Sequence, residues 1–186
     1  MILVFLHGKG SDHSAYEKQL KKLARNLSVG YVSFDAPLNY ESSSNRFTWF
    51  NKIEKNGCKI AVKEDHEFSL VYIKERLEQL GYQLSDVVLI GHSQGGGMAV
   101  CAGLKLGLKA VFSICGDLPY NIKYMSKSKT PIYWFEGAND TYISQERKES
   151  YKILKEIKAN LHYKVIDECS HNQIDSAFCE IEKILS

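Results

Sequence analysis

The sequence predicts one α/β domain over residues 1–186, with about six mostly parallel strands and helices on both faces of the sheet. Three observations support this fold class. Short apolar runs alternate along the chain with segments of helical periodicity. The runs are nearly continuous in apolar residues, which is typical of parallel strands covered on both faces. The length fits one domain, and no change of composition, internal repeat or linker divides it.

Six short runs rich in β-branched and other apolar residues are the predicted strands. In chain order they are Ile2–Leu6, Val29–Phe34, Asp86–Ile90, Ala110–Cys115, Ile132–Glu136 and Leu161–Ile166. Because helices separate these strands, we expect right-handed crossovers that make the sheet parallel.

Apolar stripes at helical spacing predict the helices. The stripes are Tyr16, Leu20, Leu23, Ala24 and Leu27, then Phe68, Val71, Tyr72 and Leu77, and finally Ile174, Ala177, Phe178, Ile181, Ile184 and Leu185. A further helix is expected over Ser144–Ala159. Ser14 and Glu17 have the spacing of a capping box and predict the start of the first helix, while Gly81 predicts the end of the second.

A long connection interrupts this alternation. Pro37–Asp65 contains no convincing helix, and its Ser-rich part is typical of a loop. Asn56-Gly57 predicts a tight hairpin turn between Phe47–Ile53 and Cys58–Val62. A connection of this length in a small domain is usually functional or mobile, so whether it covers a site is left open.

The charge and hydropathy patterns exclude several classes of partner. The 24 Lys and Arg against 22 Asp and Glu leave a net charge of +2, which is too small for the basic surface of a nucleic-acid-binding protein. No apolar run approaches the ~18 residues of a membrane span, so we expect no stable membrane insertion. The charge and hydropathy patterns do not distinguish a monomer from a homodimer.

The cysteines and the N-terminus indicate a cytoplasmic protein. Five cysteines without a Cys-x-x-Cys pair do not suggest a disulfide framework. Met1–Leu6 has no basic residue before it and is a poor signal peptide. Cys169, His171 and Cys179 lack the spacing of a zinc site, so no metal is expected.

The strongest chemical signal is a Gly-x-Ser-x-Gly motif between an apolar run and a helical segment, Gly91-His92-Ser93-Gln94-Gly95. This context is that of a nucleophile elbow. The glycines relieve the crowding of a sharp turn, and the serine hydroxyl then stands at the positive end of the following helix. The motif lacks the residues of a dinucleotide-binding turn and of a P-loop. Ser93 is therefore the predicted nucleophile.

A serine nucleophile needs a base, and the base needs an acid. Of the six histidines, His171 follows the last strand, at the edge of the sheet where α/β sites lie. His13 and His66 are expected to be solvated in polar loops. The acid should lie between the serine and the histidine in the chain. Asp140 after the fifth strand is favoured, with Asp117 after the fourth as its rival.

Two N–H groups are also needed to stabilise the oxyanion of an acyl-transfer intermediate. Gln94, at the start of the helix after the nucleophile, is expected to supply one. The Gly-rich loop after the first strand should supply the other, from Lys9 or, as second choice, Gly10. An ordinary flexible turn is the alternative for that loop.

Five motifs occur in order along the chain: Leu6-His7-Gly8-Lys9-Gly10, Gly91-His92-Ser93-Gln94-Gly95-Gly96, Ser113-Ile114-Cys115-Gly116-Asp117-Leu118-Pro119, Gly137-Ala138-Asn139-Asp140 and Ser170-His171. Together they resemble the carboxylesterase and acyl-protein thioesterase group of α/β-hydrolases, the phospholipase/carboxylesterase family. The resemblance implies a reduced α/β-hydrolase fold, a triad of Ser93, Asp140 and His171, and an oxyanion hole from the N–H groups of Lys9 and Gln94.

The resemblance also suggests where the acyl group binds. Phe47-Thr48-Trp49-Phe50 matches the family's Trp-Phe segment beside the acyl pocket, and Leu118 would line the same cleft. Core packing is the alternative for these aromatic residues. The family's longer acyl-cleft insertions are largely missing, and Glu136 stands where relatives commonly have a histidine or a small residue.

The predicted activity is hydrolysis of carboxylic esters or thioesters of short to medium acyl chains through an acyl-enzyme, with no metal or organic cofactor. The substrate would be a small ester or thioester, or an acylated protein. A non-catalytic hydrolase-like binding module, or an acyltransferase or amidase with the same triad, are the alternatives. The natural acyl chain and leaving group are left open.

Overall fold

The computed structural model of the protein describes residues 1–41, 43, 45–119, 121–142 and 145–186. Its centre is a parallel sheet of six strands in the order β10-β9-β8-β7-β1-β2. The strands are β1 Ile2–Leu6, β2 Gly30–Phe34, β7 Val87–His92, β8 Ala110–Ile114, β9 Ile132–Gly137 and β10 Leu161–Ile166. The predicted fold class is confirmed, and the predicted strand boundaries differ from these by at most two residues. The largest difference is at β7, where Asp86 belongs to a short 3₁₀ helix, η1 (Leu84–Asp86), and the strand continues to His92.

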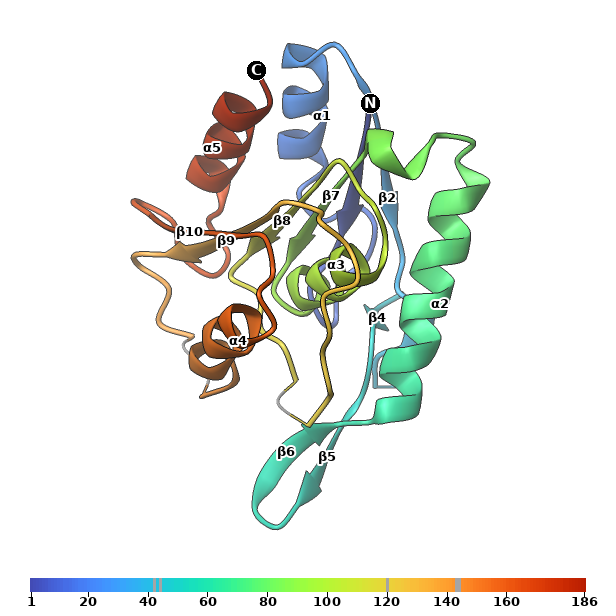
Figure 1. The fold of residues 1–186 in the computed structure, drawn as a ribbon, viewed down its shortest axis with the longest axis vertical. Helices are drawn as coiled ribbons and strands as arrows, with labels where there is room; N and C mark the ends of the chain where they lie inside the picture. The colour runs from blue at the N-terminus through green and yellow to red at the C-terminus, as the bar shows by residue number, and fades with distance from the viewer. Residues whose placement is uncertain (42, 44, 120, 143–144) are drawn as a thin grey trace.

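Helices cover both faces of this sheet (Figure 1). They are α1 Glu17–Asn26, α2 Lys63–Gln79, α3 Gln94–Lys105, α4 Gln145–Glu156 and α5 Asp175–Leu185. Successive residues of β1 enter opposite cores: Val4 and Leu6 pack with residues of α2 and α3, whereas Leu3 and Phe5 pack with residues of α1 and α5. Burial on both faces accounts for the nearly continuous apolar runs of the sequence.

The start of α1 differs from the prediction. The hydroxyl of Ser14 donates to the carboxylate of Asp12, 2.5 Å away, and α1 begins only after Tyr16, which has a φ of 56°. Among these residues no side chain caps the helix. The capping-box prediction is therefore wrong: Tyr16 and not Ser14 precedes the helix, and the Ser14 hydroxyl donates to Asp12 instead of accepting an N–H of the first helical turn.

The buried face of α2 is also different from the predicted stripe. Phe68 and Val71 are 53% and 54% exposed, whereas Leu70, Ile73 and Leu77 are buried. The buried residues follow a helical spacing of three and four, which places them on one face towards α3. A helix that begins at Lys63 also shortens the segment expected to lack a helix.

The long connection forms two small antiparallel ribbons outside the main sheet. β3 (Leu38–Asn39) pairs with β4 (Phe47–Thr48), and β5 (Lys52–Lys55) pairs with β6 (Cys58–Ala61). Asn56 and Gly57 have φ angles of 53° and 74°, as a type I′ turn requires. The predicted hairpin is confirmed, with shorter strands. Residues 42 and 44, in the Ser-rich part of the long connection, lie outside the described residues.

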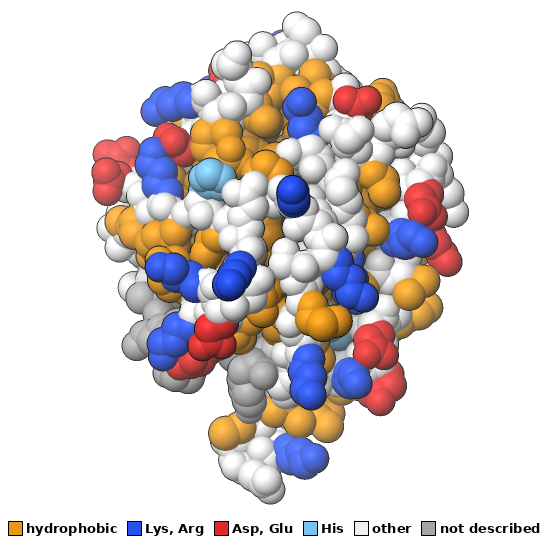
Figure 2. Space-filling view, viewed as in Figure 1, with side chains coloured by type: hydrophobic (Ala, Val, Ile, Leu, Met, Phe, Trp, Pro, Cys, Tyr) orange, Lys and Arg blue, Asp and Glu red, His pale blue; other side chains and the backbone are white. Residues whose placement is uncertain are grey.

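The described part of the chain has no helix that is both long and apolar enough to cross a membrane. On the face drawn in Figure 2, Lys and Arg side chains are scattered among hydrophobic and uncharged ones instead of forming one continuous patch.

Candidate active site

Ser93 occupies a sharp turn between β7 and α3, with φ and ψ of 52° and −120°. The turn has no room for side chains at the flanking glycines. A Cβ atom at Gly91 would lie 2.2 Å from the carbonyl oxygen of Gly95, and one at Gly95 would lie 2.4 Å from that of His7. The Ser93 N–H donates to Ile114 in the neighbouring strand, over 2.9 Å. The strand, turn and helix predicted from the motif are present, and a positive φ at a serine is a strained conformation that this packing enforces.

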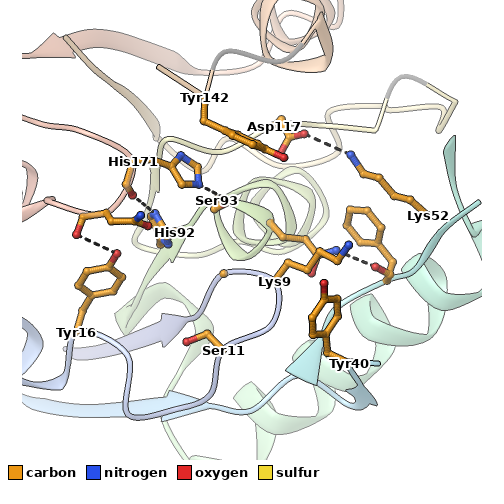
Figure 3. Close-up of a pocket in the computed structure, with 14 residues that line it drawn as sticks. Lys9, Ser11, Tyr16, Tyr40, Lys52, His92, Ser93, Asp117, Tyr142 and His171 are labelled. Atoms are coloured by element: carbon orange, nitrogen blue, oxygen red, sulfur yellow. Dashed lines mark hydrogen bonds and ion pairs between the residues drawn. The ribbon is translucent and has the colours of Figure 1, made fainter. Parts of the chain in front are cut away.

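A chain of hydrogen bonds leads from Ser93 into the protein. Nε2 of His171 lies 3.2 Å from Oγ of Ser93, and Nδ1 of His171 lies 3.1 Å from Oδ2 of Asp140. The serine follows β7, the aspartate follows β9 and the histidine follows β10, so the three residues come from the carboxyl ends of parallel strands. With Nδ1–H donating to the carboxylate, Nε2 is left to accept the serine hydroxyl. Figure 3 shows His171 turned towards Ser93.

A buried arginine that no motif of the sequence indicates completes the surroundings of Asp140. Arg147 of α4 is 4% exposed, and it donates to Oδ2 of Asp140 over 2.7 Å and to the carbonyl oxygen of Cys115 over 2.9 Å. The Tyr142 N–H donates to the other carboxylate oxygen over 2.8 Å. The spacing of Asp140 and Arg147 in the sequence matches no known motif, so their contact becomes visible only in the folded structure.

These partners determine the charge of the aspartate. Burial raises the pKa of Asp140, but hydrogen bonds from His171, Arg147 and the Tyr142 N–H outweigh burial and hold that pKa at about 2. The carboxylate is therefore ionised at neutral pH.

His92, inside the Ser93 motif, supports the loop that carries His171. Its Nε2–H donates to the carbonyl oxygen of His171 over 2.6 Å. Burial, followed by the nearby His171 ring, lowers the pKa of His92 to about 4, so it is neutral at physiological pH. Tyr16 packs edge-on against the His92 ring and donates its hydroxyl to the carbonyl oxygen of Asn172 over 3.4 Å. The His171 loop is thus held from two sides.

Asp117, the rival acid, lies elsewhere. Its carboxylate is 3.7 Å from the Lys52 ammonium on the hairpin, and the described contacts of His171 include Asp140 but not Asp117. Figure 3 shows Asp117 and Lys52 reaching towards each other in front of Ser93.

The loop after β1 contains two candidate donors of an N–H group to the oxyanion, Lys9 and Gly10. The Gly10 N–H donates to the carbonyl oxygen of Phe47 over 2.8 Å, so it is already engaged. Lys9 lines the cavity in front of Ser93, as does Gln94, the first residue of α3, whose N–H has no acceptor within its own helix. This leaves Lys9 and Gln94 as the donors that suit an oxyanion, a role that stays a prediction.

A cavity of about 420 Å³ opens beside Ser93 (Figure 3). Its wall combines the Ser93–His171 side, the loop after β1, the long connection and Asp117. The lining residues are Gly8, Lys9, Ser11, Tyr16, Tyr40, Phe50, Lys52, His92, Ser93, Gln94, Asp117, Tyr142, His171 and Asn172. This volume is in the range of small-molecule sites.

Comparison with known proteins identifies the family. The model of a family described as Phospholipase/Carboxylesterase matches residues 1–186. The chain belongs to the phospholipase/carboxylesterase family. It is accordingly a carboxylic ester hydrolase with the α/β-hydrolase fold, as the resemblance of the five motifs predicted.

Individual relatives of this carboxylesterase-family protein are distant. Acyl-protein thioesterase 1 of Gibberella zeae is 24% identical over 207 residues, which cover 98% of this chain and 88% of the relative. The structure of Arabidopsis thaliana SOBER1 has a TM-score of 0.74 and 21% identity, over 100% of this chain and 97% of that one. The Bacillus cereus carboxylesterase has a TM-score of 0.75 and 18% identity, over 99% and 86%. At such identities the structural likeness shows the fold.

The predicted acyl-pocket residues are mostly core residues in this carboxylesterase-family protein. Phe50 alone among the four lines the cavity described above. Trp49 is fully buried and donates its indole N–H to the carbonyl oxygen of His7, Leu118 is fully buried, and Phe47 packs beside the ring of His7. Phe47, Trp49 and Leu118 are thus not among the residues that line this cavity, because their side chains pack into the core. That they bind substrate stays a prediction.

The side chain of Gln94 attaches the long connection to the start of α3 by hydrogen bonds. Its carboxamide oxygen accepts hydrogen bonds from the Thr48 hydroxyl and the Trp49 N–H, each over 3.0 Å, and its amide donates to the carbonyl oxygen of Phe50 over 2.8 Å. The sequence predicts a role only for the backbone N–H of Gln94. A glutamine directly after the nucleophile was the available signal, but its partners lie more than forty residues earlier in the chain.

Two further predictions concern histidine and metal sites. His66 is not solvated: it is buried in α2, with Nε2 3.5 Å from Sγ of Cys101.

Among the described residues, Cys115, Asp140 and His171 are close enough together to hold a metal ion. Because the Arg147 guanidinium already neutralises Asp140, this cluster suits a hydrogen-bonded chain better than a cation. The expectation of no metal stays a prediction.

Proposed function

We propose that this protein hydrolyses carboxylic esters or thioesters through an acyl-enzyme formed on Ser93. The observation that carries the proposal is the chain of hydrogen bonds from Ser93 through His171 to Asp140, beside a cavity of small-molecule size. Such a chain activates a serine that is otherwise a weak nucleophile.

In the first half of the reaction, Oγ of Ser93 attacks the carbonyl carbon of the substrate and His171 takes the serine proton at Nε2. Asp140 keeps the proton of His171 at Nδ1 and stabilises the imidazolium. The backbone N–H groups of Lys9 and Gln94 stabilise the oxyanion of the tetrahedral intermediate. The bond to the alcohol or thiol then breaks, and the leaving group takes the proton from His171.

In the second half, water replaces the leaving group. His171 removes a proton from the water as its oxygen attacks the acyl carbon, and a second tetrahedral intermediate forms. When that intermediate collapses, the bond to Oγ of Ser93 breaks, the carboxylic acid leaves and the serine recovers its proton. No metal or organic cofactor enters either half.

The substrate range follows the size of the cavity. We expect esters or thioesters with short to medium acyl chains, since about 420 Å³ leaves little room for a long chain. Thioesters and acylated proteins enter the proposal because a relative is named an acyl-protein thioesterase. Location in the cytoplasm, and a monomeric or dimeric state, stay predictions from the sequence.

A fluorophosphonate probe tests the proposal, because it labels only an activated serine. Wild-type protein should be labelled at Ser93 and should hydrolyse p-nitrophenyl butyrate, and Ser93→Ala should lose both properties while keeping its thermal unfolding transition. Absence of labelling and of hydrolysis of every ester and thioester in the wild type would point to a non-catalytic binding module. Faster transfer to an added amine or alcohol than to water would point to an acyltransferase.

A further inference from the structure

The imidazole of His171 lies between the rings of two other side chains. Its centre is 5.1 Å from the centre of the His92 ring, at an interplanar angle of 56°, and 5.1 Å from the centre of the Tyr142 ring, at 45°. Figure 3 shows His171 with Tyr142 on one side and His92 on the other. The predicted base therefore contacts aromatic rings as well as its hydrogen-bond partners Ser93 and Asp140.

The two neighbouring rings are held in different ways. The His92 ring is buried and fixed by its hydrogen bond to the backbone carbonyl of His171. Tyr142 is 69% exposed, and among the residues that the structure describes the ring in contact with it is that of His171. Because so little of Tyr142 is buried, its side chain adds little to the core, and its contacts concern the site instead.

Tyr142 contacts the acid as well as the base. Its backbone N–H donates to Oδ1 of Asp140 over 2.8 Å and helps to hold the pKa of that carboxyl low, while its ring lies against His171. The backbone bond thus fixes the start of the side chain beside the acid. Substitutions other than proline retain this N–H, so the effect of the ring can be measured separately.

A ring against the imidazole can assist the reaction in two ways. It restricts rotation of the imidazole, which keeps Nε2 directed at Oγ of Ser93. It also favours the protonated imidazole, because the negative face of an aromatic ring attracts a cation within about 6 Å of its centre. The imidazole of His171 becomes that cation only as Ser93 gives up its proton, so this interaction strengthens towards the transition state and raises kcat.

We propose that Tyr142 is a positioning residue of this site, whose ring keeps the His171 imidazole directed at Ser93 and stabilises it when it is protonated. The inference rests on the proposed function and adds a residue to the groups that perform that reaction. His92 supports the other side of the imidazole without repelling its charge, because burial lowers the pKa of His92 to about 4 and leaves it neutral. The proton passes from Oγ of Ser93 to Nε2 of His171, and Tyr142 neither gives nor takes one.

Side-chain variants of Tyr142 test the proposal with p-nitrophenyl acetate and p-nitrophenyl butyrate. Tyr142→Phe keeps the ring and should retain kcat within about twofold. Tyr142→Leu keeps an apolar side chain without a ring, and we expect its kcat to fall roughly three- to tenfold while KM changes little. Equal kcat values in the Phe and Leu variants would overturn the proposal.

A second readout separates positioning from substrate binding, because Tyr142 also lines the cavity. Loss of a positioning residue should lower kcat/KM for the acetate, kcat/KM for the butyrate and the labelling rate of a fluorophosphonate probe by the same factor, since all three reactions use His171 as the base. A substrate contact would instead raise KM, and more for the butyrate than for the acetate. A rise of KM with an unchanged kcat in Tyr142→Leu would contradict the proposal.

Tyr82→Leu is the matched control. Tyr82 is also an exposed tyrosine, but it is not among the residues that line the cavity, so its kcat and KM should stay at the wild-type values. We expect both leucine variants to keep the thermal unfolding transition of the wild type, because both side chains are exposed. A kcat that falls equally in the control would contradict a specific role of Tyr142. Failure of fluorophosphonate labelling in the wild type would instead contradict the proposed function.

Discussion

The two sides of the cavity are built in different ways. The sheet wall, defined by Ser93 and His171 with Asp140 hydrogen-bonded behind His171, stands on the carboxyl ends of β7, β9 and β10. Of these strands, β7 and β9 are paired on both sides and β10 is at the edge of the sheet. The connection wall, defined by Tyr40, Phe50 and Lys52, stands on residues 37–62, which form two small ribbons outside the sheet.

The two walls are also held by different interactions. Strand pairing and tight glycine turns determine the position of the sheet wall, so its geometry follows from the fold itself. The connection wall depends on a few side chains, above all the carboxamide of Gln94. We infer that the sheet wall carries the reaction, while the connection wall contacts the rest of the substrate.

The largest effect should follow from changing the acid of the sheet wall. Asp140→Asn keeps the size of the side chain but can donate to the imidazole and stabilise the wrong tautomer. We expect kcat to fall on the order of 10²–10⁴-fold. The measurement is the steady-state hydrolysis of p-nitrophenyl butyrate.

Asp117→Asn is the matched change next to the connection wall. It should alter mainly KM or substrate preference, because Asp117 contacts Lys52 and lines the cavity. The reverse pattern, an active Asp140→Asn and a nearly inactive Asp117→Asn, would move the acid to the end of β8.

Arg147 supports the sheet wall through Asp140. Arg147→Met should lower kcat/KM roughly 10-fold to 100-fold, because the carboxylate loses a fixed partner. It should also cost about 3–5 kcal/mol of stability, since a buried charge is left unpaired. The acidic limb of the pH profile of kcat/KM should move to higher pH, because the protonated imidazole of His171 would face a carboxylate that is no longer neutralised.

Arg147→Lys is the control, since it retains the charge but not the fork that reaches both Asp140 and Cys115. Its acidic limb should stay near that of the wild type. An unchanged limb in Arg147→Met would mean that the arginine only stabilises the fold.

The connection wall should respond to Gln94→Leu, which keeps the backbone N–H but removes three buried hydrogen bonds. We expect a loss of about 2–4 kcal/mol in the free energy of unfolding, because the Trp49 N–H loses its partner and the Phe50 carbonyl keeps only the Thr48 hydroxyl. KM should rise more than kcat falls. Gln79→Leu, at the exposed end of α2, serves as the control and should change neither quantity.

The smallest predicted effect is a pH dependence of stability. Burial lowers the pKa of His66, which packs beside the Phe50 ring of the connection wall, to about 4. Because this folded-state pKa lies below the unfolded value of about 6.5, stability is fully present above pH 6.5 and is lost as the pH falls towards 4. Between pH 6.5 and 5 His66 should account for a loss of about 1–2 kcal/mol.

Chemical denaturation at several pH values measures this loss. His66→Leu should remove part of it, and the remainder should include His92, whose pKa is also lowered to about 4 by burial. His13→Asn is the control with the opposite sign: its hydrogen bond to Asp35 raises the pKa of His13, so this histidine stabilises the fold below pH 6.5. A His66→Leu profile parallel to that of the wild type would contradict the prediction.

Local sequence patterns predicted most of the sheet wall. The six apolar runs predicted the strands, and the glycines of the Ser93 motif predicted the turn, because both depend on neighbouring residues in the chain. His171 was favoured by a general property of parallel sheets, whose carboxyl ends meet at one edge, and Asp140 by the chain order of the residues that accompany a nucleophile elbow.

The sequence by itself therefore determined the fold class, the family and the residues at the carboxyl ends of the strands. Only the tertiary structure decided which face of α2 is buried, that Arg147 lies against Asp140, and that Trp49 belongs to the core while lysines and tyrosines line the cavity. The physical reason is the range of the interactions involved. A turn or a strand is favoured by residues within a few positions, whereas a buried ion pair or a cavity wall depends on segments that become neighbours only after the chain has folded.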